Sequence, residues 1–319
     1  MAPDTNMFLA QESDVAPFSD PYVTAKGEPR ASVSLVGLKT LWFNTGSLCN
    51  ITCDNCYIES SPTNDRLAYI SAAEVRAYLD EADAESLGVE EVGFTGGEPF
   101  MNHDLPAMLG DVLGRGYRAL VLTNAMKPMQ HHQKGLLALK RAYGGALALR
   151  VSIDHYAREK HEDLRGERAW GPMIEGLRWL AANGFNVHVA GRTVWDETEA
   201  ELRAGYAELF ASEGIAVDAG DHAALVLFPE MDHSSQVPEI TVHCWGILGV
   251  NPEDMMCASS RMVLKRRNAD APVVVPCTLL PNDRQFEIGP NLTDATGSIK
   301  LNHPFCAQFC VLGGGSCSA

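Results

Sequence analysis

The sequence predicts an α/β fold: a partial (β/α)6 TIM-like barrel followed by a small cysteine-rich extension. Six apolar runs alternate with five helix-like segments between residues 38 and 229, and such alternation is typical of a parallel sheet with helices outside it. A closed eight-unit barrel usually needs about 250 residues, so a stretch of about 190 residues favours an open, six-unit barrel. After residue 230 the alternation stops, and proline, glycine and cysteine become frequent.

The expected strands are short apolar runs that end in turn-forming residues. The first leads into a loop with three cysteines, and the second ends in two glycines. Ligands of parallel α/β sheets bind at the carboxyl ends of the strands, so the residues that end or follow each run are candidates for a site. The six runs are 38–44, 90–97, 117–124, 146–154, 185–194 and 222–229.

The expected helices lie between these strands and carry their own start and stop signals. Ser71 and Glu74 form the pattern of a capping box at the start of the first helix. Gly184 is a C-terminal stop for the fourth. The five helices are 71–84, 104–116, 132–144, 170–184 and 197–214.

We expect three parts along the chain: a loose N-terminal arm over 1–36, a core over 37–230 and an extension over 231–319. The arm lacks the basic start and long apolar run of a secretory signal, so a cytoplasmic location is expected. The extension has too few core residues to fold without an additional cross-link such as a bound metal centre.

Charge and hydropathy exclude two classes of partner. With 25 Lys and Arg against 41 Asp and Glu, the net charge is −16, and such a surface repels phosphate backbones. We therefore expect no nucleic-acid partner. We also expect no membrane span, because no run approaches eighteen apolar residues.

The nine cysteines are clustered. Cys49, Cys53 and Cys56 lie in one loop, and the other six all follow residue 243. Three thiolates so close suggest either a cubane iron–sulfur cluster with one iron left open or a zinc site completed by a distant residue. The zinc interpretation corresponds to a non-catalytic binding or scaffold protein, and spacing alone leaves both open.

CNITCDNCY at 49–57, followed by FTGGEP at 94–99, resembles the radical S-adenosylmethionine (radical SAM) enzymes. The resemblance covers roughly residues 37–230. It implies that Cys49, Cys53 and Cys56 hold a [4Fe-4S] cluster whose open iron binds S-adenosylmethionine (SAM). It also implies reductive cleavage of SAM to a 5′-deoxyadenosyl radical, which abstracts hydrogen from a substrate. Asn55 departs from the pattern, because the residue before the third cysteine is usually aromatic.

The same resemblance implies further SAM contacts. Gly96, Gly97 and Glu98 correspond to the stretch that meets the SAM amine. Asn124 lies at the position that lines the adenosine, and Ser152 and Asp154 end the strand that contacts the ribose. Arg165 resembles a position that pairs with the SAM carboxylate, and Arg192 is its rival. A cation is needed there because a carboxylate in a dry pocket demands a partner.

The tail resembles the SPASM or twitch-type extension of radical SAM enzymes, which carries auxiliary iron–sulfur clusters. The resemblance implies one auxiliary [4Fe-4S] cluster held by Cys257, Cys277, Cys310 and Cys317, with Cys306 interchangeable with Cys310. Structural zinc is the alternative. Residues 257–277 are expected to form a hairpin, and Cys244 is expected to be a packing residue as readily as a ligand.

The expected function is therefore a radical SAM enzyme acting on a small molecule or on a peptide or protein residue. Such an enzyme needs a low-potential electron donor such as flavodoxin or ferredoxin. The substrate itself is not identified by the sequence. Candidates for substrate contacts are Tyr57, His155, His188, Trp195 and Arg261.

Overall fold

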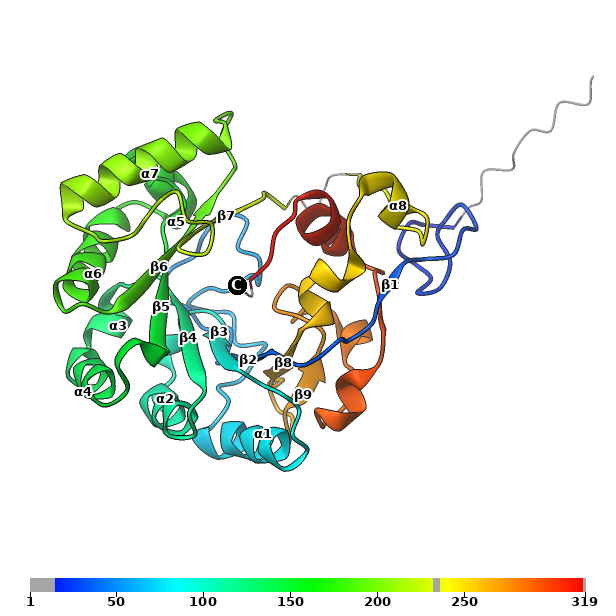
Figure 1. Cartoon of the computed structure of the whole chain (residues 1–319), viewed down its shortest axis with the longest axis horizontal. Helices are drawn as coiled ribbons and strands as arrows, with labels where there is room; N and C mark the ends of the chain where they lie inside the picture. The colour runs from blue at the N-terminus through cyan, green and yellow to red at the C-terminus, as the bar shows by residue number, and fades with distance from the viewer. Residues whose placement is uncertain (1–14, 232–235, 318–319) are drawn as a thin grey trace, which may run out of the picture.

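A curved sheet of eight strands organises the computed structural model, which describes residues 15–231 and 236–317 (Figure 1). The order is β7-β6-β5-β4-β3-β2-β8-β9, and every neighbouring pair is parallel except β8 and β9. The strands are β2 Thr40–Asn44, β3 Glu91–Thr95, β4 Arg118–Thr123, β5 Leu147–Ser152, β6 Asn186–Arg192, β7 Leu225–Phe228, β8 Ser260–Leu264 and β9 Val273–Val275.

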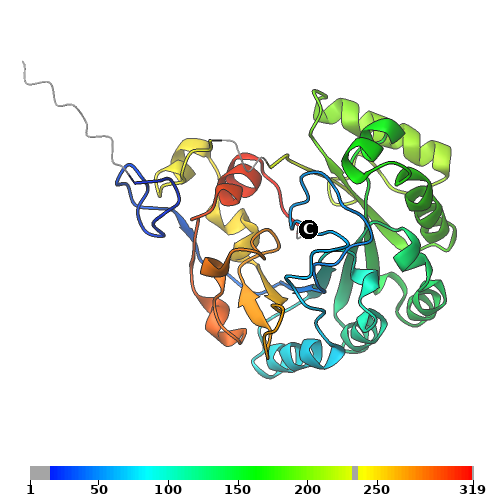
Figure 2. The same ribbon diagram turned by 180° about the vertical axis from the view of Figure 1, so that it is seen from behind.

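Helices cover the outer face of this sheet, as the two opposite views show (Figures 1 and 2). Each crossover between β2 and β7 carries at least one helix, so the predicted partial barrel of six units is confirmed. The helices are α1 Ala72–Ala84, α2 Leu105–Gly114, α3 Lys127–Gln130, α4 Gln133–Tyr143, α5 Arg158–Arg165, α6 Trp170–Ala182, α7 Glu199–Glu213 and α8 Cys244–Leu248.

Local signals in the sequence fix where these elements begin and end. The predicted capping box of α1 is present: Glu74 N donates to the Ser71 hydroxyl at 3.2 Å, and Ser71 N donates to the Glu74 carboxylate at 2.8 Å. Gly184, in the left-handed region at φ +64°, follows α6. Two short helices of the barrel, α3 and α5, were not expected. Both are brief, and α5 is almost wholly polar, so neither has a recognisable apolar period.

Two apolar cores lie on the two faces of the sheet. The larger one fills the space between the strands and helices α1 to α4, α6 and α7. The other fills the barrel interior and continues under the C-terminal extension. Trp42 fills part of that interior, and Gly93 on the neighbouring strand makes room for it, because a Cβ there would lie 2.3 Å from the indole ring. The interior is therefore packed with side chains rather than empty.

The extension bridges the two edges of the six-stranded barrel. The predicted hairpin is confirmed as β8 and β9, and β8 pairs in parallel with β2. Cys306–Leu312 form a π-helix, and its Phe309 packs against Phe228 at the end of β7, with ring centroids 5.4 Å apart. The division into core and extension remains a prediction, since the two parts share this sheet.

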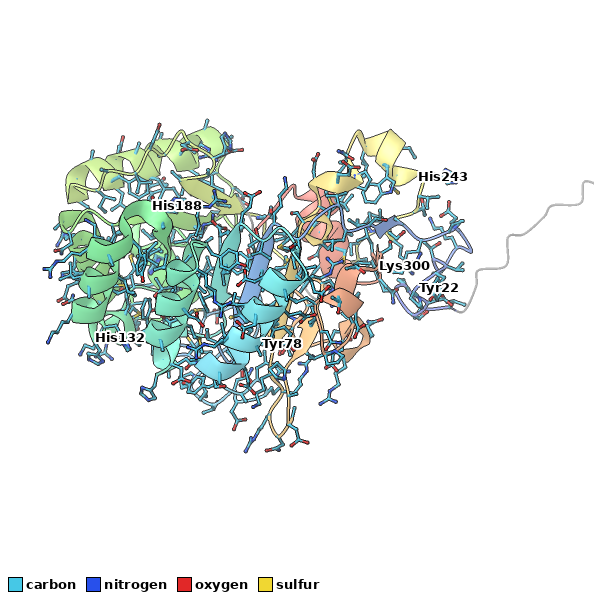
Figure 3. The ribbon with its side chains drawn as sticks, turned by 60° about the horizontal axis from the view of Figure 1, so that its bottom comes forward. Tyr22, Tyr78, His132, His188, His243 and Lys300 are labelled. Carbon is cyan, nitrogen blue, oxygen red and sulfur yellow. The ribbon has the colours of Figure 1, made fainter. Side chains whose placement is uncertain are left out.

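The described part of the N-terminal arm lies on the extension, while residues 1–14 fall outside the described residues. Strand β1, Ser32–Val33, pairs antiparallel with β10, Ile299–Lys300. The Lys300 ammonium lies 5.3 Å from the ring centroid of Tyr22, and the two residues lie together in Figure 3. Within the described residues, no helix is long and apolar enough to span a bilayer.

Candidate functional site

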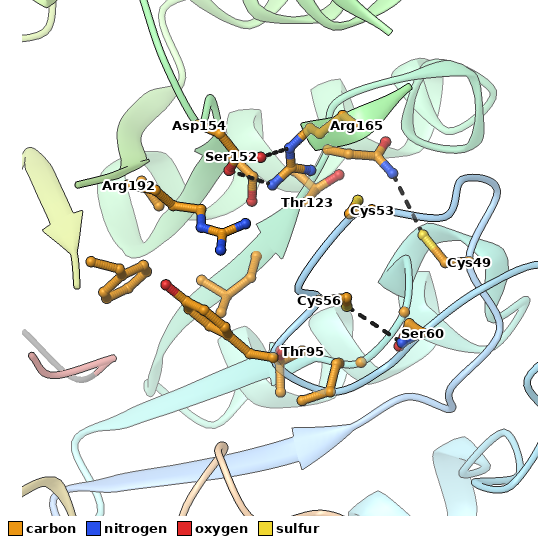
Figure 4. Close-up of a pocket in the computed structure, with 18 of the residues that line it drawn as sticks. Cys49, Cys53, Cys56, Ser60, Thr95, Thr123, Ser152, Asp154, Arg165 and Arg192 are labelled. Carbon is orange, nitrogen blue, oxygen red and sulfur yellow. Dashed lines mark hydrogen bonds and ion pairs between the residues drawn. The ribbon is translucent and has the colours of Figure 1, made fainter. Parts of the chain in front are cut away.

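A cavity of about 180 Å³ opens at the carboxyl ends of the barrel strands (Figure 4). The three cysteines of the first loop and seven of the eight predicted SAM-contacting residues line it; the exception is Glu98. The lining residues discussed below are Cys49, Cys53, Cys56, Tyr57, Gly96, Gly97, Leu122, Asn124, Ser152, Asp154, Arg165, Arg192 and Cys317. The structure thus brings together residues from five successive strand ends.

The cysteine loop is held by its own backbone. Cys49 N donates to Ser61 O at 3.1 Å, and Ser60 N donates to the Cys56 sulfur at 3.4 Å. Burial raises the pKa of Cys49 to about 12. Burial also raises the pKa of Cys53, although the nearby Arg165 opposes the shift. Buried thiols of this kind become thiolates when a metal cation compensates the charge, so the donor set fits an iron–sulfur cluster.

Asn55 has a local structural reason to replace the usual aromatic residue. Its φ is +50°, in the left-handed region that asparagine tolerates better than aromatic residues do. Its side-chain amide donates to Glu230 at 2.8 Å, which ties the cysteine loop to the segment after β7. The departure from the pattern is therefore compatible with a well-formed loop.

Gly96 and Gly97 allow close contact between two backbone segments. A Cβ on Gly97 would lie 2.0 Å from Leu48 O, and a Cβ on Gly96 would lie 2.6 Å from Gly46 O. Gly96 also has φ +137°, which side chains rarely adopt. The two glycines thus set the loop after β3 directly against the start of the cysteine loop.

Glu98 is buried behind the cavity wall instead of lining it. Its carboxylate accepts hydrogen bonds from the Thr123 hydroxyl at 2.8 Å and from Asn124 N at 2.9 Å. Burial raises the pKa of Glu98 to about 7, against the lowering effect of these hydrogen bonds. In this structure Glu98 positions the end of β4, where the Asn124 amide in turn donates to Asn50 at 2.9 Å.

Asp154 and Arg165 lie side by side in the cavity wall and form a bidentate ion pair (Figure 4). Arg165 Nε and Nη2 donate to the two Asp154 carboxylate oxygens at 2.7 and 3.0 Å. Burial favours the neutral form of Asp154, but the Arg165 guanidinium outweighs it and lowers the pKa of that carboxyl. The pair therefore joins the end of β5 to helix α5 with both charges retained.

Replacing Arg165 with methionine is expected to lower the free energy of unfolding by about 3–5 kcal/mol, because Asp154 is left as an uncompensated buried charge. Chemical denaturation measures this change. The matched control is Arg158→Met on the same helix, whose exposed pair with Glu162 spans 3.0 Å. That variant is expected to lose less than about 1 kcal/mol. Equal losses in the two variants would contradict the assignment.

Arg192, the other candidate for pairing with the SAM carboxylate, has different partners from Arg165. It forms an ion pair with Glu230 and donates to Asp54 O at 3.3 Å, and its guanidinium lies 5.2 Å from the Tyr57 ring centroid. Its buried Nε has no hydrogen-bond partner. Both arginines line the cavity; Arg165 donates its Nε and Nη2 to Asp154, whereas Arg192 is paired with Glu230 instead.

The tail cysteines divide between two cavities. A smaller cavity, walled by Met255, Leu280, Phe305 and other apolar residues, is lined by Cys257, Cys277, Cys306 and Cys310. Cys317 lies in the larger cavity with the first three cysteines. The predicted set of Cys257, Cys277, Cys310 and Cys317 therefore spans both cavities, and Cys306 shares the smaller one with Cys310. Cys244 lines neither of these two cavities.

The candidates for substrate contacts have separate surroundings. Tyr57 lines the cavity, and its hydroxyl donates to Pro229 O at 2.8 Å. The His155 imidazole lies 2.7 Å from the Glu197 carboxylate and packs edge-on against Trp195. None of His155, Trp195, His188 and Arg261 is among the residues that line the larger cavity.

The comparisons with known proteins agree with this geometry. A family model described as the radical SAM superfamily matches residues 43–206, just over half of the chain. The chain belongs to the radical SAM superfamily. The resemblance in the cysteine motif is thereby confirmed, and SAM cleavage at an iron–sulfur cluster is the chemistry of this superfamily.

Three curated relatives share part of this radical SAM core. Fe-coproporphyrin III synthase of Methanosarcina barkeri is 30% identical over 146 residues, which are 46% of this chain and 34% of that protein. GTP 3′,8-cyclase of Tolumonas auensis is 27% identical, over 43% of this chain and 39% of that protein. The antilisterial bacteriocin subtilosin biosynthesis protein AlbA of Bacillus subtilis is 28% identical, over 44% and 30%. The matches span only about a third of each relative.

Two solved structures have a similar fold. SuiB of Streptococcus suis bound to S-adenosylmethionine superimposes with a TM-score of 0.58 at 11% identity, over 79% of this chain and 63% of that one. The structure of anSMEcpe with bound AdoMet gives 0.57 at 13% identity, over 81% and 79%. At these identities the likeness supports the radical SAM fold alone.

Proposed function

We propose that this chain is a radical SAM enzyme that forms a 5′-deoxyadenosyl radical in the larger cavity and abstracts hydrogen from a small molecule or a peptide residue. The observation that carries the proposal is the set of residues around one cavity. Three thiols, two glycines that fix their loop, and two cations, Arg192 at the end of β6 and Arg165 on helix α5, surround this cavity. When bound, a [4Fe-4S] cluster supplies the electron that cleaves SAM.

The chain's own residues have distinct proposed roles. Cys49, Cys53 and Cys56 hold the cluster, and Arg192, a cation in the cavity lining, pairs with the SAM carboxylate. Asn124, Ser152 and Asp154 face the nucleoside; Arg165 holds Asp154 in place. Glu98 acts indirectly, by fixing the backbone of Asn124.

The electron has to come from outside the chain, and we propose flavodoxin or ferredoxin as its source. A reducing compartment such as the cytoplasm suits nine cysteines that are all free. Peptide substrates are one of the two substrate classes in the proposal, since a structure of SuiB is described as bound to the precursor peptide SuiA.

The test is an anaerobic assay of the reconstituted wild-type protein. With dithionite and SAM, we expect 5′-deoxyadenosine and methionine in equal amounts, together with bound iron and sulfide. A colourless protein that contains zinc but no iron would overturn the proposal and favour the non-catalytic scaffold. Among the described residues, no three Cys, His, Asp or Glu side chains are grouped as the ligands of one metal ion are. A four-iron cluster spreads its thiolates more widely than a single zinc ion does.

The smaller cavity is the proposed site of an auxiliary [4Fe-4S] cluster. All four of its cysteines are buried deeply enough to raise their pKa values, to about 12 for Cys277 and about 11 for Cys257. Cys306 and Cys310 lie one turn apart on the π-helix. We propose these four as the ligands, with Cys317 left to the larger cavity.

Replacing Cys257 and Cys277 with alanine is expected to lower bound iron from about eight to about four atoms per chain, because one of two four-iron clusters is lost. Iron analysis with Mössbauer spectroscopy checks this. Cys244→Ala is the matched control and should keep all of the iron. Unchanged iron content in the double variant would exclude the auxiliary cluster. Comparing Cys306→Ala with Cys317→Ala then shows which of these two cysteines is a cluster ligand, because only the variant that lacks a ligand should lose iron.

A further inference from the structure

The hairpin of the extension contains an arginine that is closed off from solvent. Arg261 on β8 is 0% exposed, and it lines neither the larger nor the smaller cavity. The sequence made Arg261 a candidate for substrate contacts, but its position in the structure argues against such contacts. The buried charge therefore calls for another explanation.

Backbone carbonyls hold the guanidinium in place. Its Nε donates to Ala295 O at 2.7 Å, and its Nη2 donates to Gly297 O at 3.1 Å. Its Nη1 donates to Cys257 O at 2.6 Å and to Ser260 O at 2.7 Å. These bonds occupy four of the five N–H groups of the guanidinium. The carbonyls satisfy its hydrogen bonds, but each of them supplies only a partial negative charge.

The side chains whose charge acts on Arg261 are cysteines of the smaller cavity. Burial lowers the pKa of Arg261, and among the described residues the thiolates of Cys257 and Cys277 are the groups that oppose this shift. Both cysteines line the smaller cavity. Strand β8 follows Cys257 and β9 leads into Cys277, so the hairpin brings the arginine and both thiols together.

A cation at this place acts on the charge of a cluster in the smaller cavity. Four thiolates outweigh the positive charge of a cubane [4Fe-4S] core, so such a cluster is anionic, and one-electron reduction makes it more so. In a buried region of low dielectric constant, a fixed cation stabilises the more negative of two states by the larger amount. Arg261 therefore favours the reduced form of a cluster held beside it.

We propose that Arg261 is the counter-charge of the auxiliary [4Fe-4S] cluster and raises its reduction potential. A buried cation is tolerated when it is paired, and the thiolates of the four proposed ligands supply the full negative charge that the carbonyls do not. Arg261 is thus a positioning residue, which fixes the backbone of Cys257 and makes the cluster easier to reduce. This inference rests on the auxiliary cluster of the proposed function.

The test measures the reduction potential of the auxiliary cluster alone. When Cys49, Cys53 and Cys56 are all replaced by alanine, the remaining iron belongs to the extension, and an anaerobic redox titration followed by electron paramagnetic resonance gives its midpoint potential. Adding Arg261→Gln to this parent variant is expected to lower the ratio of reduced to oxidised cluster about tenfold at a fixed potential. For a one-electron couple this is a shift of about 59 mV to lower potential. Arg261→Lys keeps the charge and should shift the potential much less.

The matched control is Arg267→Gln, which removes the same charge from an exposed arginine beyond the end of β8 that is paired with Asp65. It should leave the potential of the parent variant unchanged. An unchanged potential in Arg261→Gln would overturn the inference. An equal shift in Arg261→Lys and Arg261→Gln would also overturn it, because the hydrogen bonds of the guanidinium, rather than its charge, would then be responsible.

Iron analysis decides the case in which Arg261→Gln fails to load a cluster. Iron that is retained in Arg261→Lys but lost in Arg261→Gln supports the inference, because the charge is then needed to hold the cluster. Loss of iron from both variants would make Arg261 a structural clamp on the hairpin and would overturn the inference. A parent variant without iron would refute the auxiliary cluster itself, whereas an iron-loaded parent whose potential is independent of Arg261 refutes this inference alone.

Discussion

A variant in which Cys49, Cys53 and Cys56 are all replaced by alanine is expected to form no 5′-deoxyadenosine above background. The three thiols line one cavity, and a cluster without them has no protein ligands there. Anaerobic incubation with SAM and dithionite, followed by chromatographic detection of 5′-deoxyadenosine, measures the loss. Bound iron should fall by about four atoms per chain, the content of one cluster.

The control for this variant is Cys244→Ala. Cys244 is half-buried, lies outside both cavities, and its sulfur accepts from Thr241 N at 3.4 Å. Its removal should leave both the product yield and the iron content at the wild-type level. Formation of 5′-deoxyadenosine by the triple variant would show that SAM is cleaved elsewhere, and the assignment of the larger cavity would then be wrong.

Gly97→Ala is expected to disrupt the site without removing any ligand. The new Cβ would lie 2.0 Å from Leu48 O and 2.9 Å from Cys49 N. Both atoms belong to the backbone, so the two loops have to separate. Overpacking of this kind costs about 1–3 kcal/mol, and we expect the upper end because no flexible side chain can move aside. Iron uptake during reconstitution and the yield of 5′-deoxyadenosine should both fall.

Gly110→Ala provides the comparison for this prediction. Gly110 lies inside helix α2, and a Cβ there would meet nothing within 4 Å. Since glycine weakens a helix interior, this substitution should raise the free energy of unfolding by about 0.5–1 kcal/mol. Denaturation midpoints and iron content of the two variants separate the effect of the backbone contact at Gly97 from the general effect of replacing a glycine. Equal changes in the two variants would contradict the close approach of Gly97 to the Leu48 backbone.

The fold was predictable because the strands and the longer helices of the core carry their own local patterns. The capping box at Ser71 and the glycine after α6 are short-range signals, and both are present. Helices α3 and α5 lacked such signals. The pairing of β8 with β2 joins residues more than 200 positions apart, and no local pattern specifies it.

The candidate site was predictable only at the level of motifs. The cysteine spacing identified the residues of the loop, and the superfamily match confirms the family to which that motif belongs. The pairing of Asp154 with Arg165 depends on how helix α5 sits on the barrel. The division of Cys306 and Cys317 between two cavities depends on the path of the tail. Spacing in sequence carries neither piece of information, because both follow from tertiary packing.

The parallel pairing of β2 with β8 has a consequence for synthesis and folding. All five residues of β2 are buried, and its two neighbours are β3 and β8. On a ribosome β2 emerges long before β8 is made, so one side of β2 stays an open edge, able to pair with a strand of another chain. A chain truncated before β8 would leave this edge of β2 permanently unpaired. By pairing with β2, strand β8 therefore covers an edge through which the N-terminal part of the chain could aggregate.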